Sequence, residues 1–150
     1  MQTPWPLNFG VFYAPFHPVG QDPTLALEYD LERTVELDRL GYDEAWFGEH
    51  HSGGYELIGS PEIFIAAAAQ RTKYIKLGTG VVSLPYHHPW LLADRIALLD
   101  HLTRGRLIFG CGPGALPTDE AKPCGWGVKP WEPLGGSPRS ATISVTPASA

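Results

Sequence analysis

The residues best suited to chemistry in this sequence are two adjacent histidines and the acid before them, Glu49, His50 and His51. They follow a short apolar stretch, residues 45–47, and the single glycine Gly48. Such a stretch is typical of a strand buried on both faces, and α/β folds place their chemistry at the carboxyl ends of strands. Because histidine titrates near neutral pH, the triplet predicts a proton-transfer site. The alternative is one capping and one solvated histidine.

Metal binding is a second chemistry open to these residues. Carboxylate and imidazole groups are zinc ligands, and the sequence offers them at Glu49, His50, His51, His87 and His88. Adjacent residues of a strand point in opposite directions, so His50 and His51 are poorly placed to share one ion. A metal-dependent barrel hydrolase is therefore the less favoured alternative, and no metal ligand is assigned.

The elements that must position these residues recur with a regular period. Apolar, strand-like runs begin near residues 7, 44, 75 and 107, with helix-like stretches between them. This alternation predicts βαβ units with a parallel sheet, either half of a (β/α)8 barrel or an open doubly wound sheet. A whole barrel takes about 250 residues, so the 150 residues here predict about four βα units.

The first and third strands have distinct patterns. Residues 7–14 form a near-continuous apolar run, which predicts a strand buried on both faces. Residues 75–82 are expected to form the third strand, and residues 107–111 the fourth, with Cys111 as buried filler. The glycine-rich stretch 112–117 then predicts a loop at the end of the fourth strand.

Capping residues mark the expected helices. Asp22 is the predicted N-cap of the first helix and Gly41 its end, while Ser60 is the predicted cap of the second. A third helix is expected to stop near Arg104-Gly105. Apolar residues at helical spacing predict the core-facing sides of the first helix, at Leu27, Leu31, Val35 and Leu40, and of the third, at Leu92, Ile96 and Leu99.

The overall composition excludes several classes of partner. A net charge of −5 and the lack of a basic run argue against nucleic-acid binding. There is no basic residue before Arg33 and no long apolar run, so neither a signal peptide nor a membrane span is expected. The two cysteines, Cys111 and Cys124, have no disulfide or zinc spacing, which fits a cytoplasmic protein.

The character of the sequence changes near residue 120. We expect residues 1–120 to form the half-barrel domain and residues 121–150, rich in proline and glycine, to form an irregular, disordered tail. Only residues 141–145 have the pattern of a short strand. The helix that the βαβ rhythm requires is missing from this segment, which suggests a shifted reading frame or a truncated gene.

Several motifs in order resemble the bacterial luciferase-like, flavin-dependent monooxygenases, and residues 12–20 and 112–117 are most similar to the limonene monooxygenase-type branch. The motifs are Glu49-His50-His51, residues 79–85, His88-Pro89, Leu99-Asp100 and residues 105–110. The resemblance implies part of a (β/α)8 barrel that uses reduced FMN and O2 to oxygenate a small apolar substrate. It also implies a homo-oligomer when the barrel is complete. The electrons come either from a nicotinamide bound by this chain or from a separate NAD(P)H-using flavin reductase.

The resemblance also assigns roles to particular residues. His50 matches the family's proposed catalytic histidine, with Glu49 and His51 as orienting groups at the cofactor. The Gly80-Val81 bond matches a site where some relatives have a cis peptide under the flavin, a strand-end bulge being the alternative. Gly112 is expected to let the backbone pass close to the flavin edge.

The loops that hold the cofactor phosphate in such barrels follow strands seven and eight. This chain alone is therefore expected to bind flavin weakly or not at all. A non-catalytic half-barrel remnant is the alternative to an active oxygenase.

Overall fold

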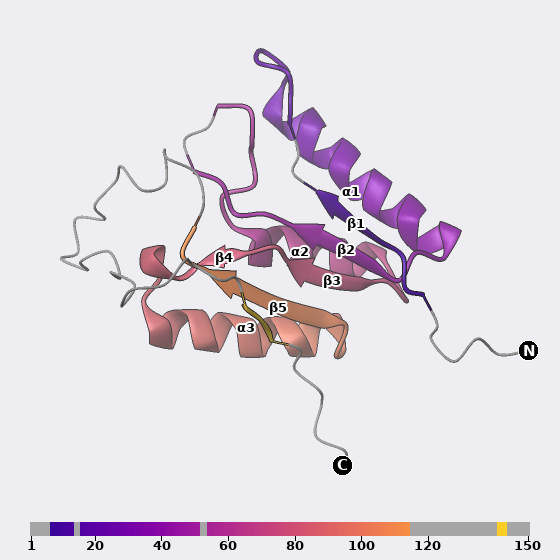
Figure 1. Cartoon of the computed structure of the whole chain (residues 1–150). Coiled ribbons are helices and arrows are strands. Elements are labelled where there is room, and N and C mark those ends of the chain that lie inside the picture. Colours follow the sequence, from indigo (N-terminus) through magenta and orange to yellow (C-terminus); the bar gives the residue numbers. More distant parts are fainter. Residues whose placement is uncertain (1–6, 14–15, 52–53, 115–140, 144–150) are drawn as a thin grey trace, which may run out of the picture.

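A parallel sheet forms the centre of the computed structural model, which describes residues 7–13, 16–51, 54–114 and 141–143. Its main strands lie side by side in chain order (Figure 1): β1 (Gly10–Tyr13), β2 (Glu44–Phe47), β3 (Lys76–Thr79) and β5 (Leu107–Gly112). The short strand β4 (Val82–Ser83) pairs with β5 beyond β3, and β6 (Ala141–Ile143) pairs with β5 in the antiparallel direction.

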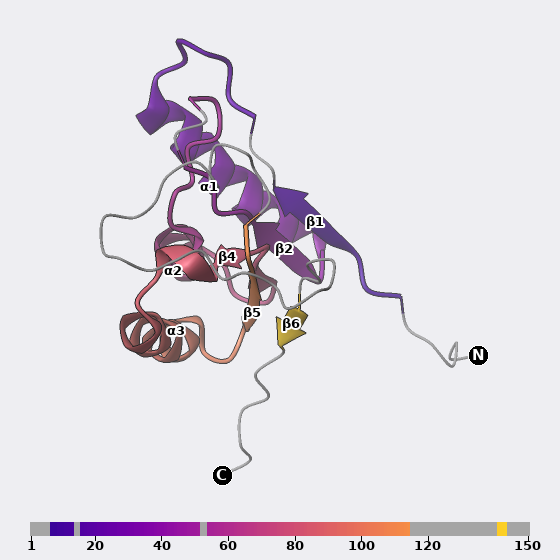
Figure 2. The same cartoon turned by 60° about the vertical axis from the view of Figure 1, so that its left-hand side comes forward.

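Helices cover one face of this sheet, as Figure 2 illustrates: α1 (Pro23–Leu40), α2 (Pro61–Arg71) and α3 (Pro89–Thr103). The 3-10 helix η1 (Leu84–Tyr86) lies between β4 and α3. A doubly wound sheet has helices on both faces and a strand order that reverses, whereas a barrel has helices only outside and strands in sequence. The structure therefore selects the barrel segment from the two architectures that the sequence left open.

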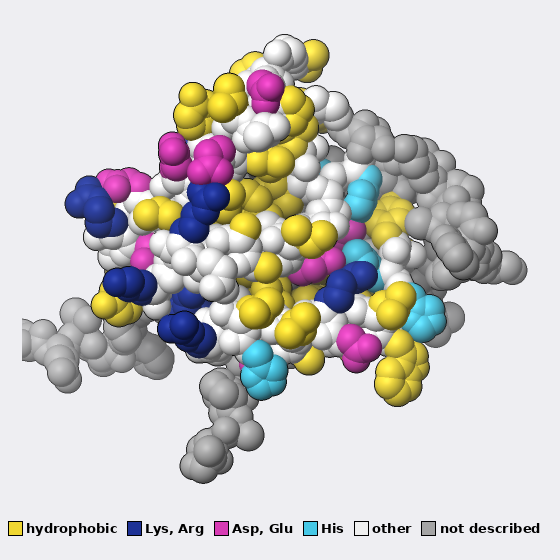
Figure 3. Space-filling model, turned by 180° about the vertical axis from the view of Figure 1, so that it is seen from behind, with side chains coloured by type: hydrophobic (Ala, Val, Ile, Leu, Met, Phe, Trp, Pro, Cys, Tyr) yellow, Lys and Arg dark blue, Asp and Glu magenta, His cyan; other side chains and the backbone are white. Residues whose placement is uncertain are grey.

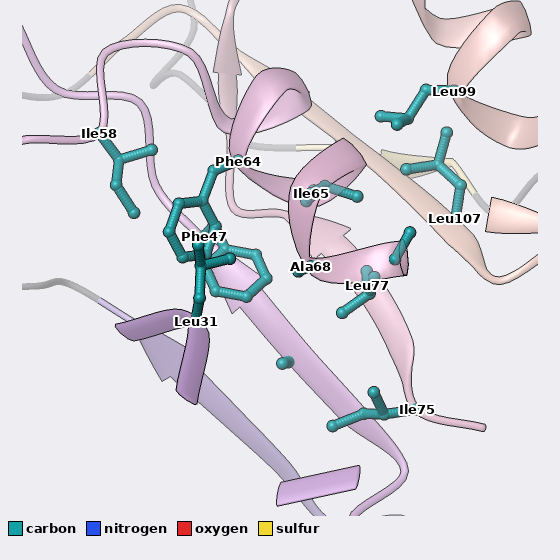
Figure 4. Close-up of a cluster of buried hydrophobic side chains, with 12 residues drawn as sticks. Leu31, Phe47, Ile58, Phe64, Ile65, Ala68, Ile75, Leu77, Leu99 and Leu107 are labelled. Atoms are coloured by element: carbon teal, nitrogen blue, oxygen red, sulfur yellow. The ribbon is translucent and has the colours of Figure 1, made fainter. Parts of the chain in front are cut away.

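The core lies between the sheet and the helices (Figure 4). Phe47 on β2 and Phe64 on α2 form its centre, with ring centroids 4.9 Å apart. Leu77 on β3 and Leu107 on β5 extend it towards α3, where Leu99 closes it. Every second residue of β2 faces this core, so the residues between them face the side that becomes the interior of a barrel.

Two strand predictions need correction. The first strand spans only Gly10–Tyr13, and it is not buried on both faces, because the side chain of Phe12 is 57% exposed. Among the described strands β1 pairs only with β2, so its other edge and its inner face lack cover. The expected third strand is interrupted at Gly80-Val81 and forms β3 and β4 instead of one element.

The predicted caps of α1 are confirmed, but other details of the helices differ. The Asp22 side chain accepts hydrogen bonds from the backbone N–H groups of Thr24 and Leu25, and Gly41 ends the helix with φ +81°. Ser60 stands at the N-cap of α2, but its side chain makes no capping hydrogen bond. Leu40 is exposed, because the buried face of α1 runs through positions 26, 30, 31 and 34.

The prediction for α3 is largely confirmed, and the remaining predictions lie near the end of the described chain. Leu92 and Leu99 are buried, and the helix ends at Arg104, which has φ +59°. Cys111 is half-buried instead of buried. The expected strand at 141–145 is present as β6, while the other predictions for residues 115–150 lie outside the described residues. None of the helices in the described part of the chain has the length and apolar character needed to cross a bilayer.

Candidate active site

The carboxyl end of β2 delivers the acid and the two histidines to one edge of the sheet. Ala45 and Phe47 are fully buried against the helices, and Gly48 follows them. The chain then leaves the strand, and the Glu49 side chain is buried at 3% residue exposure. We call this edge, where the ends of β1, β2, β4 and β5 lie together, the rim.

Glu49 is the centre of a hydrogen-bonded cluster. Its Oε1 lies 2.7 Å from Nε2 of His51 and 2.9 Å from Nε2 of His87, and its Oε2 accepts the backbone N–H of Ser83 at 2.7 Å. Burial by itself raises the pKa of this carboxyl group, but hydrogen bonds from His87, His51 and Ser83 outweigh burial and lower the pKa below its ordinary value. Glu49 is therefore an ionised group inside the protein, and it joins the end of β2 to β4 and to the loop after η1.

His50 has a different partner. Its Nδ1 lies 3.0 Å from Oε2 of Glu56, and its backbone N–H donates to the carbonyl of Ile58. A Cβ on Gly48 would lie only 2.5 Å from Nε2 of His50, so this glycine is what allows the ring to fold back on the strand end. Both ring nitrogens are buried. The two adjacent histidines thus contact separate carboxylates, as their alternation along the chain predicts.

The Gly80-Val81 peptide is cis, and it lies within a bulge. The β3 residues 77 and 78 pair with 107 and 108, whereas 82 and 83 of β4 pair with 111 and 112, so 79–81 stand opposite only 109–110. The one extra residue satisfies the definition of a bulge. Thr79 repairs the ladder there, because its Oγ1 donates to the carbonyl of Gly110 at 2.7 Å and accepts the N–H of Gly110 at 2.9 Å.

Three of the predicted cofactor residues lie together at this bulge. A Cβ on Gly112 would lie 3.1 Å from Cγ2 of Val81, and a Cβ on Gly80 would lie 2.8 Å from the ring of Phe12. The absence of a side chain at each glycine thus leaves room for Phe12 and Val81, and Ser83 links this bulge to the Glu49 cluster.

Sequence reasoning missed a second buried pair near the rim. Nε2 of His17 lies 2.8 Å from Oδ2 of Asp30, and the two residues are 8% and 0% exposed. The backbone N–H of His17 donates to the carbonyl of Tyr55, so the loop after β1 lies against the loop after β2. The spacing of Asp30 from the buried Ala26 and Thr34 is the signal that could have revealed it, since a helical polar residue four positions from both shares their face.

The cluster does not favour a metal centre. In the part of the chain that the structure describes, no group of three or more histidine, cysteine or acidic residues is placed to hold an ion. Nδ1 of His87 faces Nη2 of Arg95 at 2.9 Å. An arginine N–H can only donate, while a neutral histidine bound to metal through Nε2 presents an N–H at Nδ1, so two donors would meet there.

The fold and the rim agree with what comparison with known proteins shows. The chain matches the luciferase-like monooxygenase family over residues 7–134 and belongs to that family. The match and the helix-covered parallel strands together identify part of a luciferase-like (β/α)8 barrel.

Among its relatives is the limonene 1,2-monooxygenase of Rhodococcus erythropolis, 62% identical over 119 residues, which make up 79% of this chain and 30% of that protein. The 4-hydroxyprotoasukamycin monooxygenase of Streptomyces nodosus subsp. asukaensis is 58% identical over 75% of this chain and 30% of its own length. The chain thus spans about a third of the length of these relatives.

A solved structure supports the fold. The oxygenating constituent of 3,6-diketocamphane monooxygenase from Pseudomonas putida, in complex with FMN, superimposes with a TM-score of 0.73 at 33% identity. The superposition covers 77% of this chain and 32% of that protein. The sequence-based expectation of a partial luciferase-like barrel is therefore confirmed.

Proposed function

We propose that this chain forms the N-terminal part of a flavin-dependent monooxygenase barrel that uses reduced FMN and O2 to oxygenate a small apolar molecule. The observation that carries the proposal is the rim, where the ionised Glu49 and His51 are joined through Ser83 to the bulge at Gly80 and Gly112, whose missing side chains leave room for Phe12 and Val81. Membership of the luciferase-like monooxygenase family supports it. So do the FMN in the Pseudomonas relative and the monooxygenase names of the others.

Each rim residue then has a task. Gly80, Val81 and Gly112 present backbone and a short apolar side chain to the flat face of the flavin, which supplies the redox chemistry when bound. His50 is the general acid/base, and the carboxylate of Glu56 lies 3.0 Å from its Nδ1. Glu49 and His51 form a second acid–imidazole pair that orients the cofactor edge.

The source of electrons and the partners follow from the same comparison. The trigonelline monooxygenase relative from Acinetobacter baylyi is named an oxygenase component, and the Pseudomonas relative an oxygenating constituent. We therefore assign delivery of reduced FMN to a separate reductase that uses NAD(P)H. We also propose that the complete barrel to which this chain belongs is a homo-oligomer in the cytoplasm.

A chimera tests the proposal. Residues 7–119 of this chain replace the corresponding segment of the Rhodococcus limonene 1,2-monooxygenase, and the oxygenated product is measured by mass spectrometry with reduced FMN and O2. We expect product from the chimera and a loss of about a hundredfold in turnover for His50→Gln, the usual size of a lost general acid/base. His101→Gln, on the exposed far end of α3, is the matched control. A folded chimera without product, or full activity in His50→Gln, contradicts the proposal.

A further inference from the structure

A series of contacts between charged side chains and imidazole rings runs from the first turn of α2 to the rim. Glu62 in the first turn of α2 is 6% exposed, and its Oε1 lies 3.4 Å from Nε of Arg95 on α3. Nη2 of Arg95 lies 2.9 Å from Nδ1 of His87. Nε2 of His87 reaches Glu49, which in turn contacts Nε2 of His51. Neither Glu62, Arg95 nor His87 has a role in the function proposed above.

The contact between Arg95 and His87 fixes a proton. All N–H groups of a guanidinium are donors and none can accept, and arginine keeps its charge at any physiological pH. Nδ1 of His87 must therefore be the acceptor, which leaves the single ring proton on Nε2. His87 therefore donates to Glu49 through its Nε2–H.

The consequence concerns the charge of Glu49. Its side chain is 0% exposed, and the pKa of this carboxyl group is lowered, so it carries a negative charge. His87, fixed by Arg95, solvates that charge by a hydrogen bond. His51 is the other imidazole on Oε1, its ring is 37% exposed, and it packs edge-on against Tyr86. Among the described residues, His51 is thus the more exposed of the two imidazoles on Glu49, since the side chain of His87 is 11% exposed.

We propose that Arg95 and His87 are positioning residues of the rim. Arg95 locks His87 as the Nε2–H tautomer, and His87 holds Glu49 so that its charge is directed to His51, a second proton-transfer group beside His50. The use of His51 in oxygenation rests on the function proposed above, whereas the tautomer of His87 does not depend on it.

The tautomer is measured on the chain itself. Two-bond proton–nitrogen correlation spectra of isotope-labelled histidine, assigned with single His→Gln variants, distinguish a bare ring nitrogen from an N–H. We expect His87 of the wild type to be the Nε2–H tautomer at neutral pH. A wild-type His87 that is the Nδ1–H tautomer overturns the proposal.

Substitutions of Arg95 show whether its N–H donor fixes the His87 tautomer or whether packing around His87 does so. Arg95→Met removes the donor and is expected to release His87 into a mixture of tautomers, whereas Arg95→Lys places an ammonium donor there and restores the wild-type spectrum. Arg39→Met, which removes an exposed arginine from α1, is expected to change nothing at His87. Unchanged His17 signals report that each variant is folded. A His87 tautomer that is the same in Arg95→Met as in the wild type refutes the lock.

The chimera tests the role of His51 separately. If His51 transfers protons, Arg95→Met shifts the pH profile of oxygenation, Arg95→Lys returns it, and the affinity for FMN stays the same. A pH profile that is unmoved while the tautomer changes leaves the lock standing and removes His51 from the reaction. An inactive chimera refutes the proposed function and the role of His51 together, while the spectra on the chain still decide the lock.

Discussion

Two ionised carboxylates mark opposite edges of the sheet, and they are held by different kinds of donor. At the amino end of β3, Asp38 of α1 accepts three consecutive backbone N–H groups at 2.7–2.8 Å, those of Lys73, Tyr74 and Ile75. At the carboxyl ends, Glu49 accepts one backbone N–H and contacts two imidazoles. A backbone amide does not titrate in the physiological range, whereas an imidazole does. We call the side of the sheet where the strands begin the amino edge. Its donors to Asp38 keep their protons, which favours stability, whereas the rim contains groups that can exchange protons.

The arginines show the same contrast. Arg106 uses all five N–H groups, on one backbone carbonyl in α2 and two in the α2–β3 connection, the carbonyl of Thr103 and the hydroxyl of Thr72. Arg95 at the rim is half-exposed and contacts one histidine and one acid. Figure 3 agrees, since the histidines lie mainly towards one end of the face and most Lys and Arg side chains towards the other. At the amino edge every N–H group of Arg106 has a hydrogen-bond acceptor, whereas the rim contains histidines, which can change protonation.

A substitution in the bulge at the rim is expected to have the largest effect on stability. It tests whether the rim, like the amino edge, is rigidly packed. A Cβ on Gly110 would lie 2.3 Å from the carbonyl oxygen of Thr79, so Gly110→Ala must displace backbone and is expected to cost about 3 kcal/mol of unfolding free energy. In the control, Gly112→Ala, the Cβ meets only a methyl group of Val81 at 3.1 Å, and the cost is smaller. Urea unfolding followed by circular dichroism measures the unfolding free energy of both variants. Equal losses would mean that the backbone at the bulge can shift to accommodate a Cβ on Gly110.

Arg106→Met gives the next largest effect and tests the amino edge. The variant leaves several partly buried carbonyls without a donor, for which we expect a loss of about 2 kcal/mol in unfolding free energy. Arg39→Met removes an exposed i,i+3 ion pair with Glu36 and is expected to change stability little. His87 should keep its tautomer in both variants. If Arg106→Met is no less stable than Arg39→Met, the amino edge is not the stabilising end.

Much of this arrangement could be predicted from local patterns. The caps at Asp22 and Gly41, the strand period and the triplet after β2 depend only on neighbouring residues, and each was found. The broken third strand was not, because the bulge depends on how Thr79 meets Gly110, 31 positions away. A linear pattern contains no information on such a pairing unless a family resemblance supplies it.

The partners of the histidines were equally out of reach. The sequence places His50 and His51 together, but whether each finds Glu49 or Glu56 depends on the path of the loop after β2. Arg95 looks like an exposed helical residue in the sequence, and only the packing of α3 against α2 brings it to His87 and Glu62. The residues able to do chemistry can thus be predicted from their types, whereas the direction of each proton depends on tertiary contacts.

Glu49→Gln sharpens the comparison from the rim. The amide removes the charge and turns one acceptor into a donor that faces the N–H of Ser83 or of His87, so we expect a loss of about 1.5 kcal/mol at neutral pH. Hydrogen exchange of the Ser83 amide should become faster, because its charged acceptor is replaced either by a neutral, weaker acceptor or by a donor. Glu36→Gln on the exposed face of α1 is the matched control. Unchanged exchange at Ser83 would mean that Glu49 does not tie β4 to β2.

Asp38→Asn is expected to have the smallest effect, and its pH dependence reveals how the amino edge works. Burial raises the pKa of Asp38, but the N–H groups of Ile75, Lys73 and Tyr74 and the nearby charge of Arg106 outweigh it and hold the pKa below the ordinary 3.8. A carboxyl group whose pKa is lower in the folded than in the unfolded state stabilises the protein above its unfolded pKa. That contribution is lost as the pH falls through the folded pKa. At neutral pH we therefore expect Asp38→Asn to be less stable by about 1 kcal/mol, a modest value because the group is partly screened by solvent.

Below about pH 4, where carboxyl groups ordinarily protonate, the difference between Asp38→Asn and the wild type should shrink. The matched variant Glu49→Gln should respond differently, because Glu49 contacts the imidazole of His51 as well as a backbone N–H, and an imidazole, unlike an amide, can gain or lose a proton in the physiological range. Its difference from the wild type should therefore change at a higher pH than that at which carboxyl groups ordinarily protonate. Urea unfolding across this range, on the wild type and both variants, measures the two curves. Curves of the same shape would show that the two edges do not differ in how they hold a charge, since fixed amides and titrating imidazoles cannot give the same dependence.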